Sequence, residues 1–416
     1  MIYSAQWAAV RGGPVSAVAM SARERVLAAI RSPNASAILR ELLGKGPRSR
    51  SAIAQAMQLT ETAVSRAAQR LIVEGVLVEG KHLAERSGPG RPSVELEFGP
   101  GFYVAGIGIR GYTQWVELRR LGGEPIVSEH FACEDLTDPI AVLRRCCKEL
   151  DTLLRARRIP RHRVLNVGVL IVGVVDPATG TVLRAENLGW RRVEVKQILE
   201  AITDFPLTFE TMLNGMNLHQ GVQASKSPEN SLLVSVALGI GASVVVDGRI
   251  THGSGFAAGQ LGHLRSRNST LRCVCGRVGC LDTIASGRAI LRENGLLEGS
   301  AQFGMRELAE RFRKLSATAR SHPDVAAALG RAGHELGAAI GGAIALLDPG
   351  DIVFTGFVID DDHYFDAVRD ELSWYRTGTS AQRADFIRRP QGGEGAPSMI
   401  AALSLAAERG RIGGFD

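Results

Sequence analysis

The sequence has no apolar run long enough to cross a membrane. Its longest nearly uncharged apolar runs, Val234–Val246 and Leu336–Leu347, are shorter than the roughly 20 residues that a membrane-spanning helix needs. Met1–Met20 lacks the basic leader and apolar core of a secretory signal, and we expect it to be disordered. A chain of 416 residues with 45% hydrophobic and 22% charged residues is typical of a globular protein with two or three domains. We expect it in the cytoplasm, with no membrane partner.

Cysteine is scarce, with six in the chain, yet three of the six lie within eight residues. These are Cys273, Cys275 and Cys280, and His263 precedes the first by ten residues. One imidazole and three thiolates form a ligand set that suits tetrahedral zinc and leaves no position open for substrate. Glycines inside the cluster let the backbone turn tightly enough to bring the ligands together. We predict a structural zinc site between residues 263 and 280. The alternative is a set of ordinary buried thiols.

The excess of positive charge is small and lies at one end. Residues 1–100 hold 13 Lys or Arg against 8 Asp or Glu, so +5 of the net +6 lies in the first quarter of the chain. A basic small end on a nearly neutral body indicates a polyanionic partner for that end, although a solvated basic face would give the same count.

The basic end has the pattern of a winged helix-turn-helix. A short helix at Ser51–Met57 is followed by a tight turn and a second helix, which Thr60 caps and which runs to about Glu74. Two strands, Val76–Val78 and Val94–Phe98, then flank the basic tip SGPGRPS. We therefore predict a winged helix-turn-helix domain over residues 21–100.

In this type of domain the second helix enters the major groove of DNA, where Arg and Gln read base edges and Ser and Thr hold phosphates. Apolar residues on one stripe of the helix leave a polar face outside. The candidate DNA contacts are that face and the tip of the wing: Thr62, Ser65, Arg66, Gln69, Arg70 and Arg91. The alternative is a module that docks another protein.

From residue 101 onward, strands alternate with helices. Leu165–Val175 is nearly all apolar, as in a strand buried on both faces, and Ile140–Arg155 is amphipathic. We predict an α/β body over residues 101–416, built as two similar lobes with a ligand cleft between them.

Four segments of the chain together resemble the ROK family, which includes bacterial sugar kinases and transcription repressors. They are the GRP of the wing, VGVLIVGVVDPATGTVLRAENLGW, GASVVVDGRITHGSGFAAGQLGH and CVCGRVGCLD. The resemblance covers nearly all of residues 35–410 and implies an actin/hexokinase-like body in two lobes. The winged helix-turn-helix at the front is similar to the repressor branch.

The motifs that carry kinase chemistry in this family are altered here. The resemblance aligns Met212 with the carboxylate that takes the proton from the sugar hydroxyl, a role that a thioether cannot fill. The kinase phosphate motif Asp-x-Gly-Gly-Thr is replaced by Gly108-Ile109-Arg110-Gly111-Tyr112, and Leu238 replaces the threonine of a second phosphate motif. We therefore expect no kinase activity.

The resemblance also indicates where an effector would bind. In the family a Glu precedes the Leu-Gly-His and another follows the last cysteine, and both bind sugar hydroxyls; here these positions are Gln260 and Asp282. The candidate effector contacts are Asn187, Thr211, Asn214, Gln260, His263 and Asp282. The alternative for Asn187, Gln260 and Asp282 is that they only tie loops together. A small carbohydrate is the favoured effector, and a non-sugar ligand or a protein partner is the alternative.

The sequence thus predicts a transcription regulator, a repressor, that binds double-stranded operator DNA as a homodimer or tetramer. The alternative from the enzyme class is a sugar kinase that phosphorylates hexoses or N-acetylhexosamines and has an added DNA-binding head. A zinc sensor, in which the metal is the signal, is a second alternative.

Overall fold

The computed structural model describes residues 20–80, 94–111, 113–123, 125–223, 230–297, 304–375, 387–389 and 396–405. Among them, no helix is both long enough and apolar enough to span a bilayer. The expected disorder of residues 1–20 falls, except for Met20, outside these residues. The tip of the wing and its Arg91 also lie outside them.

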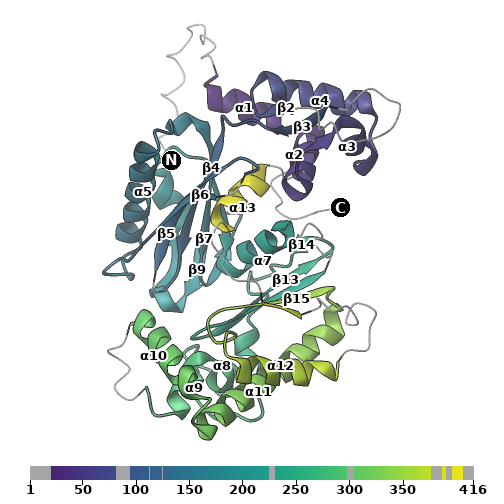
Figure 1. The fold of residues 1–416 in the computed structure, drawn as a ribbon. Coiled ribbons are helices and arrows are strands. Elements are labelled where there is room, and N and C mark those ends of the chain that lie inside the picture. The colour runs from purple at the N-terminus through teal and green to yellow at the C-terminus, as the bar shows by residue number, and fades with distance from the viewer. Residues whose placement is uncertain are drawn as a thin grey trace, which may run out of the picture.

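The first part of the chain forms a small helical head with a three-stranded sheet, ordered β1-β3-β2 (Figure 1). The Thr60 side chain caps α4 by accepting from the Ala63 N–H, and Gly75 follows the helix at φ +73°. Both features agree with the sequence prediction. The elements are α1 (Ala22–Ile30), α2 (Pro33–Lys45), β1 (Arg48–Ser49), α3 (Arg50–Ala56), α4 (Glu61–Val73), β2 (Leu77–Glu79) and β3 (Glu95–Phe98).

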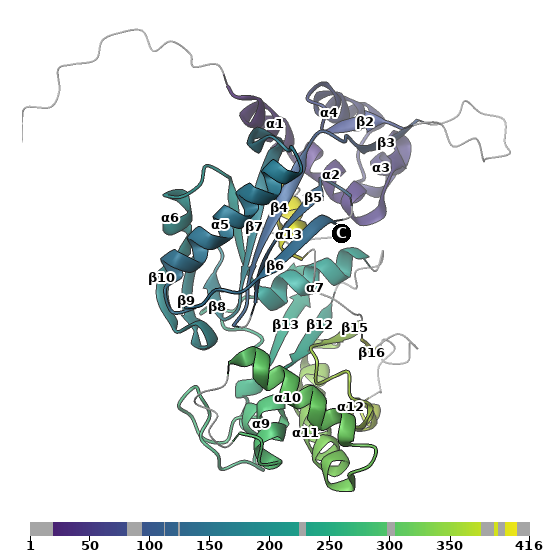
Figure 2. The ribbon, with the colours of Figure 1, turned by 60° about the vertical axis from the view of Figure 1, so that its left-hand side comes forward.

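The next part forms a first lobe around a five-stranded sheet ordered β11-β7-β4-β5-β6. A short three-stranded sheet, β10-β9-β8, extends it. Helix α5 covers one face of the large sheet (Figure 2). The elements are β4 (Tyr103–Ile109), β5 (Gln114–Arg120), β6 (Pro125–Phe131), α5 (Pro139–Ala156), η1 (Arg161–Arg163), β7 (Val164–Ile171), β8 (Val174–Asp176), β9 (Thr181–Ala185), η2 (Glu186–Leu188), β10 (Trp190–Glu194), α6 (Val195–Glu200) and β11 (Leu207–Thr211).

A second lobe repeats the same sheet topology. Its five strands are ordered β14-β13-β12-β15-β16. When the strands of each five-stranded sheet are numbered along the chain, both sheets have the order 3-2-1-4-5. The predicted α/β body with two similar lobes is therefore confirmed. The elements are β12 (Ser231–Val236), β13 (Ile240–Val246), β14 (Arg249–Ile250), η3 (Leu261–His263), α8 (Asp282–Ala285), α9 (Gly287–Glu293), α10 (Met305–Thr318), α11 (Pro323–Leu347), β15 (Asp351–Thr355), α12 (Asp362–Ser373) and β16 (Ile387–Arg388).

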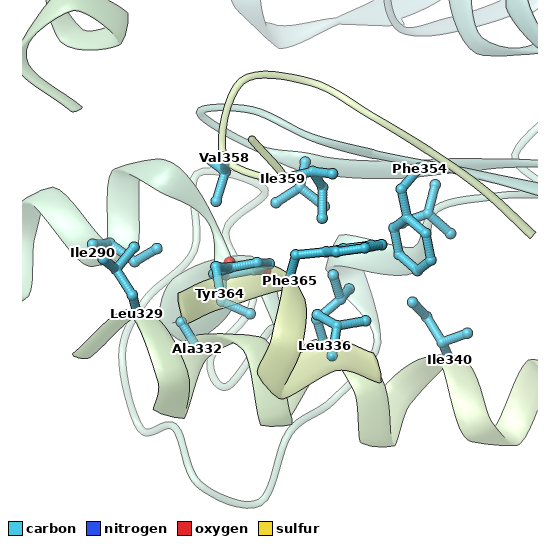
Figure 3. Packing of buried hydrophobic residues seen from close by; sticks show 14 of the residues in the cluster. Ile290, Leu329, Ala332, Leu336, Ile340, Phe354, Val358, Ile359, Tyr364 and Phe365 are labelled. Atoms are coloured by element: carbon cyan, nitrogen blue, oxygen red, sulfur yellow. The ribbon is translucent and has the colours of Figure 1, made fainter. Parts of the chain in front are cut away.

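The second lobe has a large apolar core of its own, shown in Figure 3. Phe365 of α12 packs edge-on against Phe354 of β15, with ring centroids 5.6 Å apart. Tyr364 is fully buried beside it, and its hydroxyl donates to the Ala285 carbonyl at 2.7 Å. This core holds α11 and α12 against the five-stranded sheet of the second lobe.

Two helices join the lobes. α7 (Met212–Gln223) follows the last strand of the first sheet, and α13 (Ala396–Leu405) returns from the second lobe to pack on β4 and β7. Met212 and Met216 of α7 share one buried cluster with Leu170 of the first sheet and Leu233 of the second. The two sheets are therefore connected through packed side chains as well as through the chain.

The head shares its core with the first lobe. Ile38 of α2 and Leu71 of α4 lie in the same buried cluster as Leu165 of β7 and Ala401 of α13. A polar anchor adds to this contact, because Arg23 of α1 donates to the backbone carbonyls of Asp204 and Arg161 at 3.0 and 2.6 Å. Arg23 and Arg161 also both lie over the Phe205 ring. These contacts hold the head to the first lobe.

Candidate functional site

A cavity of about 1150 Å³ lies between the two lobes. Residues from both sheets line it, and the structure brings all six predicted effector contacts to its wall: Asn187, Thr211, Asn214, Gln260, His263 and Asp282. Amides, a hydroxyl, an imidazole and a carboxylate facing one cavity can donate to and accept from a ligand rich in hydroxyl groups.

Two of these six residues also hold the local backbone or their neighbours in place. Asp282 Oδ1 accepts from the Ile240 N–H at 2.7 Å, and burial raises the pKa of this carboxyl to about 6. Asn214 Nδ2 donates to Glu210 Oε1 at 2.8 Å. Asp282 therefore ties two segments together and also lines the cavity, so for this residue the two interpretations made from the sequence are compatible.

His252, which the sequence reasoning missed, links the two lobes across the cleft. Its Nε2 lies 2.7 Å from Glu210 Oε2, with Glu210 at the end of the first sheet and His252 after β14 of the second. Glu210 is 1% exposed, and its other oxygen accepts from the Thr211 N–H and from Asn214. The hydrogen bond that the His252 ring donates to the Glu210 carboxylate raises the pKa of His252. Because the two residues are 42 positions apart, no local pattern indicates this contact.

The His252–Glu210 pair gives the protein a specific pH dependence. A histidine whose pKa is raised on folding contributes stability that is fully present below its unfolded pKa of about 6.5 and is lost as pH rises through the raised value. We expect the free energy of unfolding of the wild-type protein to fall more between about pH 6 and pH 9 than that of His252→Gln, which keeps a hydrogen-bond donor but does not titrate. Urea denaturation of both proteins at the two pH values measures this difference. Equal pH dependence in both proteins would show that the pair does not contribute.

Apolar side chains occupy the space at the positions of the altered kinase motifs. Met212 and Leu238 line the cavity and are almost fully buried. At Gly108 a Cβ atom would lie 2.2 Å from the indole of Trp115, so no side chain fits there without displacing this tryptophan. The space next to the altered phosphate motif is therefore filled by Trp115, and it cannot hold the acidic residue of the kinase motif.

The predicted metal ligands converge on one point. The ligand atoms of His263, Cys273, Cys275 and Cys280 all lie within 4.8 Å of one another. The Cys275 and Cys280 sulfurs are 3.7 Å apart, and a tetrahedron with Zn–S bonds of about 2.3 Å has edges of about 3.8 Å. Burial lowers the pKa of His263, which favours the neutral imidazole that a metal requires. The donor set and spacing can therefore hold a metal ion.

Local backbone geometry explains why the cluster forms. Gly276 and Gly279 have φ values of +87° and +81°, which residues with a Cβ rarely adopt. A Cβ on Gly279 would also lie 2.9 Å from the Ser269 carbonyl oxygen. His263 and Val274 both line the cavity, so the metal loop forms part of its wall.

The outer face of α4 is polar. Of the five predicted contacts on this helix, Thr62, Arg66, Gln69 and Arg70 are exposed, whereas Ser65 is half-buried. Val64 and Leu71, on the opposite side, are completely buried in the head. α3 and α4 are separated by a tight turn in which Gln58 has a φ of +52°. The arrangement is that of a helix-turn-helix whose second helix presents its polar face to solvent.

A protein-family model described as the ROK family matches residues 130–409. The xylose repressor of Caldicellulosiruptor bescii is 27% identical over 259 residues, which cover 61% of this chain and 64% of that protein, so the chain spans a little under two thirds of its length. The transcriptional dual regulator NagC of Escherichia coli is 28% identical over 344 residues, covering 80% of this chain and 82% of that protein. A crystal structure of a ROK family transcriptional regulator, described as a homologue of the E. coli Mlc protein, matches 92% of this chain and 96% of its own with a TM-score of 0.71 and 22% identity.

Proposed function

Because the chain belongs to the ROK family, we propose that it is a DNA-binding transcription repressor that responds to a carbohydrate or related small ligand and has no kinase activity. The observation that carries this proposal is the exposed polar face of α4 on a head that is packed against a two-lobed body with a cavity of about 1150 Å³. Related proteins are named as xylose and N-acetylglucosamine repressors, which favours a sugar as the effector.

In this proposal residues 21–100 form the DNA-binding domain and residues 101–416 the effector domain. Arg66, Gln69 and Arg70 read base edges in the major groove, and Thr62 and Ser65 hold the phosphate backbone. Arg91, at the tip of the wing, adds a contact to the DNA backbone or the minor groove. A homodimer then requires a roughly palindromic operator with half-sites a whole number of helical turns apart.

Contacts between the head and the first lobe provide a route for regulation. The head packs against Leu165 of the first lobe, and Arg23 of the head binds that lobe's backbone, so we expect the head to move together with the first lobe. A ligand that binds one arrangement of the lobes better than another would shift the population toward it and so change the spacing of the two heads in a dimer. The effector contacts in this proposal are the six cavity residues named above, with Asn187 and Gln260 supplying amide groups.

The metal in this proposal is a structural zinc ion bound by His263 and the three cysteines. Four protein ligands leave no open position, which is the pattern of a structural and not a catalytic zinc. Such a site holds zinc tightly, which disfavours the zinc-sensor alternative. Three zinc-binding thiolates and otherwise free cysteines are compatible with a reducing cytoplasm.

Selection of fragments from the host genome by the full-length protein tests the DNA-binding proposal. We expect the protein to enrich a small set of promoter fragments that share a palindrome, and a sugar found by thermal-shift screening to change their binding in gel shifts. Failure to enrich any fragment, combined with hexose-dependent ATP turnover, would replace this proposal with the kinase alternative.

Replacing the lost proton acceptor alone is not expected to create a kinase. Met212→Asp restores a carboxylate, but Trp115 still occupies the space beside Gly108 and Leu238 still replaces a phosphate-binding hydroxyl. A missing general base accounts for only about 100-fold to 10,000-fold in rate, so restoring it cannot replace the lost phosphate contacts. We expect no hexose-dependent ADP release from the wild-type protein or from Met212→Asp in a coupled assay with hexoses and N-acetylhexosamines. Turnover by Met212→Asp would show that the phosphate motifs still function.

A further inference from the structure

A cationic side chain, Arg110, lines the cavity at the end of β4. Its guanidinium carbon lies 4.8 Å from the ring centroid of the buried Trp115, and Nη2 lies 3.7 Å from the Met216 sulfur of α7. The backbone of Arg110 is also fixed, since its N–H donates to the Thr113 carbonyl at 3.0 Å and its carbonyl accepts from Gln114 Nε2 at 2.8 Å. Arg110 is therefore held in place by an aromatic platform and a tight turn.

Arg110 has no anionic partner among the residues that the structure describes. Acids of the first lobe in this region have other partners: Glu186, which lines the cavity, pairs with Arg184 at 2.6 Å, and Glu210 pairs with His252 at 2.7 Å. Glu117 accepts from the Trp115 indole and from the Ser398 N–H. Methionine sulfur and an indole face are weak partners for a guanidinium, which has five N–H donors. A half-buried arginine with these neighbours has most of its hydrogen-bonding capacity directed at the cavity or at solvent.

The packing around Arg110 leaves no room for an acidic side chain at residue 108, two positions earlier in the chain. The Trp115 indole that supports Arg110 also fills the space above Gly108, where a Cβ atom would lie 2.2 Å from the ring. Trp115 therefore leaves no room for a side chain at residue 108 and also orients the guanidinium of Arg110. The result is a positively charged corner in the first-lobe half of the cavity.

We propose that Arg110 binds an anionic substituent of the effector, so that the cavity selects a sugar phosphate or a sugar carboxylate over the neutral sugar. This inference rests on the proposed effector function and specifies the chemical class of its ligand. A planar guanidinium binds either a phosphate or a carboxylate through two parallel hydrogen bonds, and such charge-assisted bonds are about twice as strong as neutral ones. The neutral amides of Asn187 and Gln260 would then contact the hydroxyl groups.

Isothermal titration of the full-length protein with matched ligand pairs tests the proposal. The probes are glucose, glucose 6-phosphate and glucuronate, N-acetylglucosamine and its 6-phosphate, and inorganic phosphate as a competitor. We expect one anionic sugar to bind roughly ten- to a hundred-fold more tightly than its neutral counterpart, and inorganic phosphate to compete with it. Preference for the phosphates or for glucuronate distinguishes the two kinds of anion.

The variant Arg110→Gln should abolish this preference while leaving binding of the neutral sugar unchanged. Arg313→Gln is the matched control, because Arg313 lines the same cavity from the second lobe, lies over Phe357 and carries the same charge. Loss of the preference in Arg313→Gln but not in Arg110→Gln would overturn the assignment. Thermal unfolding of both variants shows whether each is folded.

Two other outcomes separate this inference from the proposed function. Equal affinity for neutral and anionic sugars in the wild-type protein overturns the role of Arg110 and leaves a sugar-responsive repressor intact. Absence of binding by every sugar and by inorganic phosphate contradicts the anionic subsite, because inorganic phosphate requires only the arginine corner. Genome-fragment selection, which needs no effector, still reports independently on the DNA-binding function.

Discussion

Cys275→Ser is expected to lose its metal ion and to unfold its second lobe at a markedly lower temperature. Serine oxygen is a poor replacement for thiolate at a zinc site, and the remaining three ligands cannot close the tetrahedron. Structural zinc contributes roughly 10 kcal/mol or more of apparent binding energy in small domains, and part of it stabilises the fold that presents the ligands. In a lobe with its own apolar core we expect a loss of about 3 kcal/mol or more in the free energy of unfolding.

Metal content by mass spectrometry and thermal unfolding, each with and without a chelator, measure this effect. Cys133→Ser is the matched control, since Cys133 is a half-buried free cysteine packed on the core of the first lobe. The control should bind metal in the same ratio as the wild-type protein, and the chelator should lower the melting temperature of both. A full metal complement in Cys275→Ser would remove Cys275 from the ligand set.

Arg66→Ala is expected to abolish selective operator binding while leaving the fold intact. Arg66 is exposed on the polar face of α4, so its removal creates no cavity, and it forms no ion pair with the residues that the structure describes. A bidentate contact from arginine to a guanine is worth about 1–3 kcal/mol, and a symmetric dimer would lose it twice. We therefore expect a loss of roughly 30-fold or more in affinity for the selected fragment, with little change for random DNA.

Gel shifts at fixed salt, with the selected fragment and a scrambled fragment of the same length, measure the effect. Arg306→Ala, on the exposed surface of α10 in the second lobe, removes the same charge far from the head and should leave both affinities unchanged. A similar decrease in affinity for both DNA fragments in Arg66→Ala would indicate that Arg66 contacts a phosphate and not a base. No decrease on either fragment would place Arg66 outside the interface.

Local sequence was sufficient to predict the features that depend on near neighbours. The turn at Gln58, the cap at Thr60 and the apolar stripe of α4 follow from residues within a few positions of one another. The edge strand β6 of the first sheet has no clear sequence signal, because it is exposed or half-buried along its length and begins with proline, so its alternation of apolar and polar residues is weak.

The cavity could be predicted in outline only through the family resemblance. Asn187, Thr211 and Gln260 are far apart in the chain, and no spacing rule brings them together. The resemblance identified Arg110 as part of an altered phosphate motif, yet its role as an oriented cation depends on Trp115 from the neighbouring strand. No local sequence pattern predicts the contact made by His252, because its partner Glu210 belongs to the other lobe.

Local sequence predicted the His/Cys cluster and the polar helix of the head, because each depends on residue type at short range. The family resemblance indicated that Met212 stands in the place of the kinase carboxylate. Only the tertiary structure decided that the head shares its core with the first lobe and that a histidine joins the two lobes. It also decided that Trp115 orients the guanidinium of Arg110 in the cavity. Those three features result from packing between residues distant in the chain, where burial and charge pairing depend on which surfaces meet.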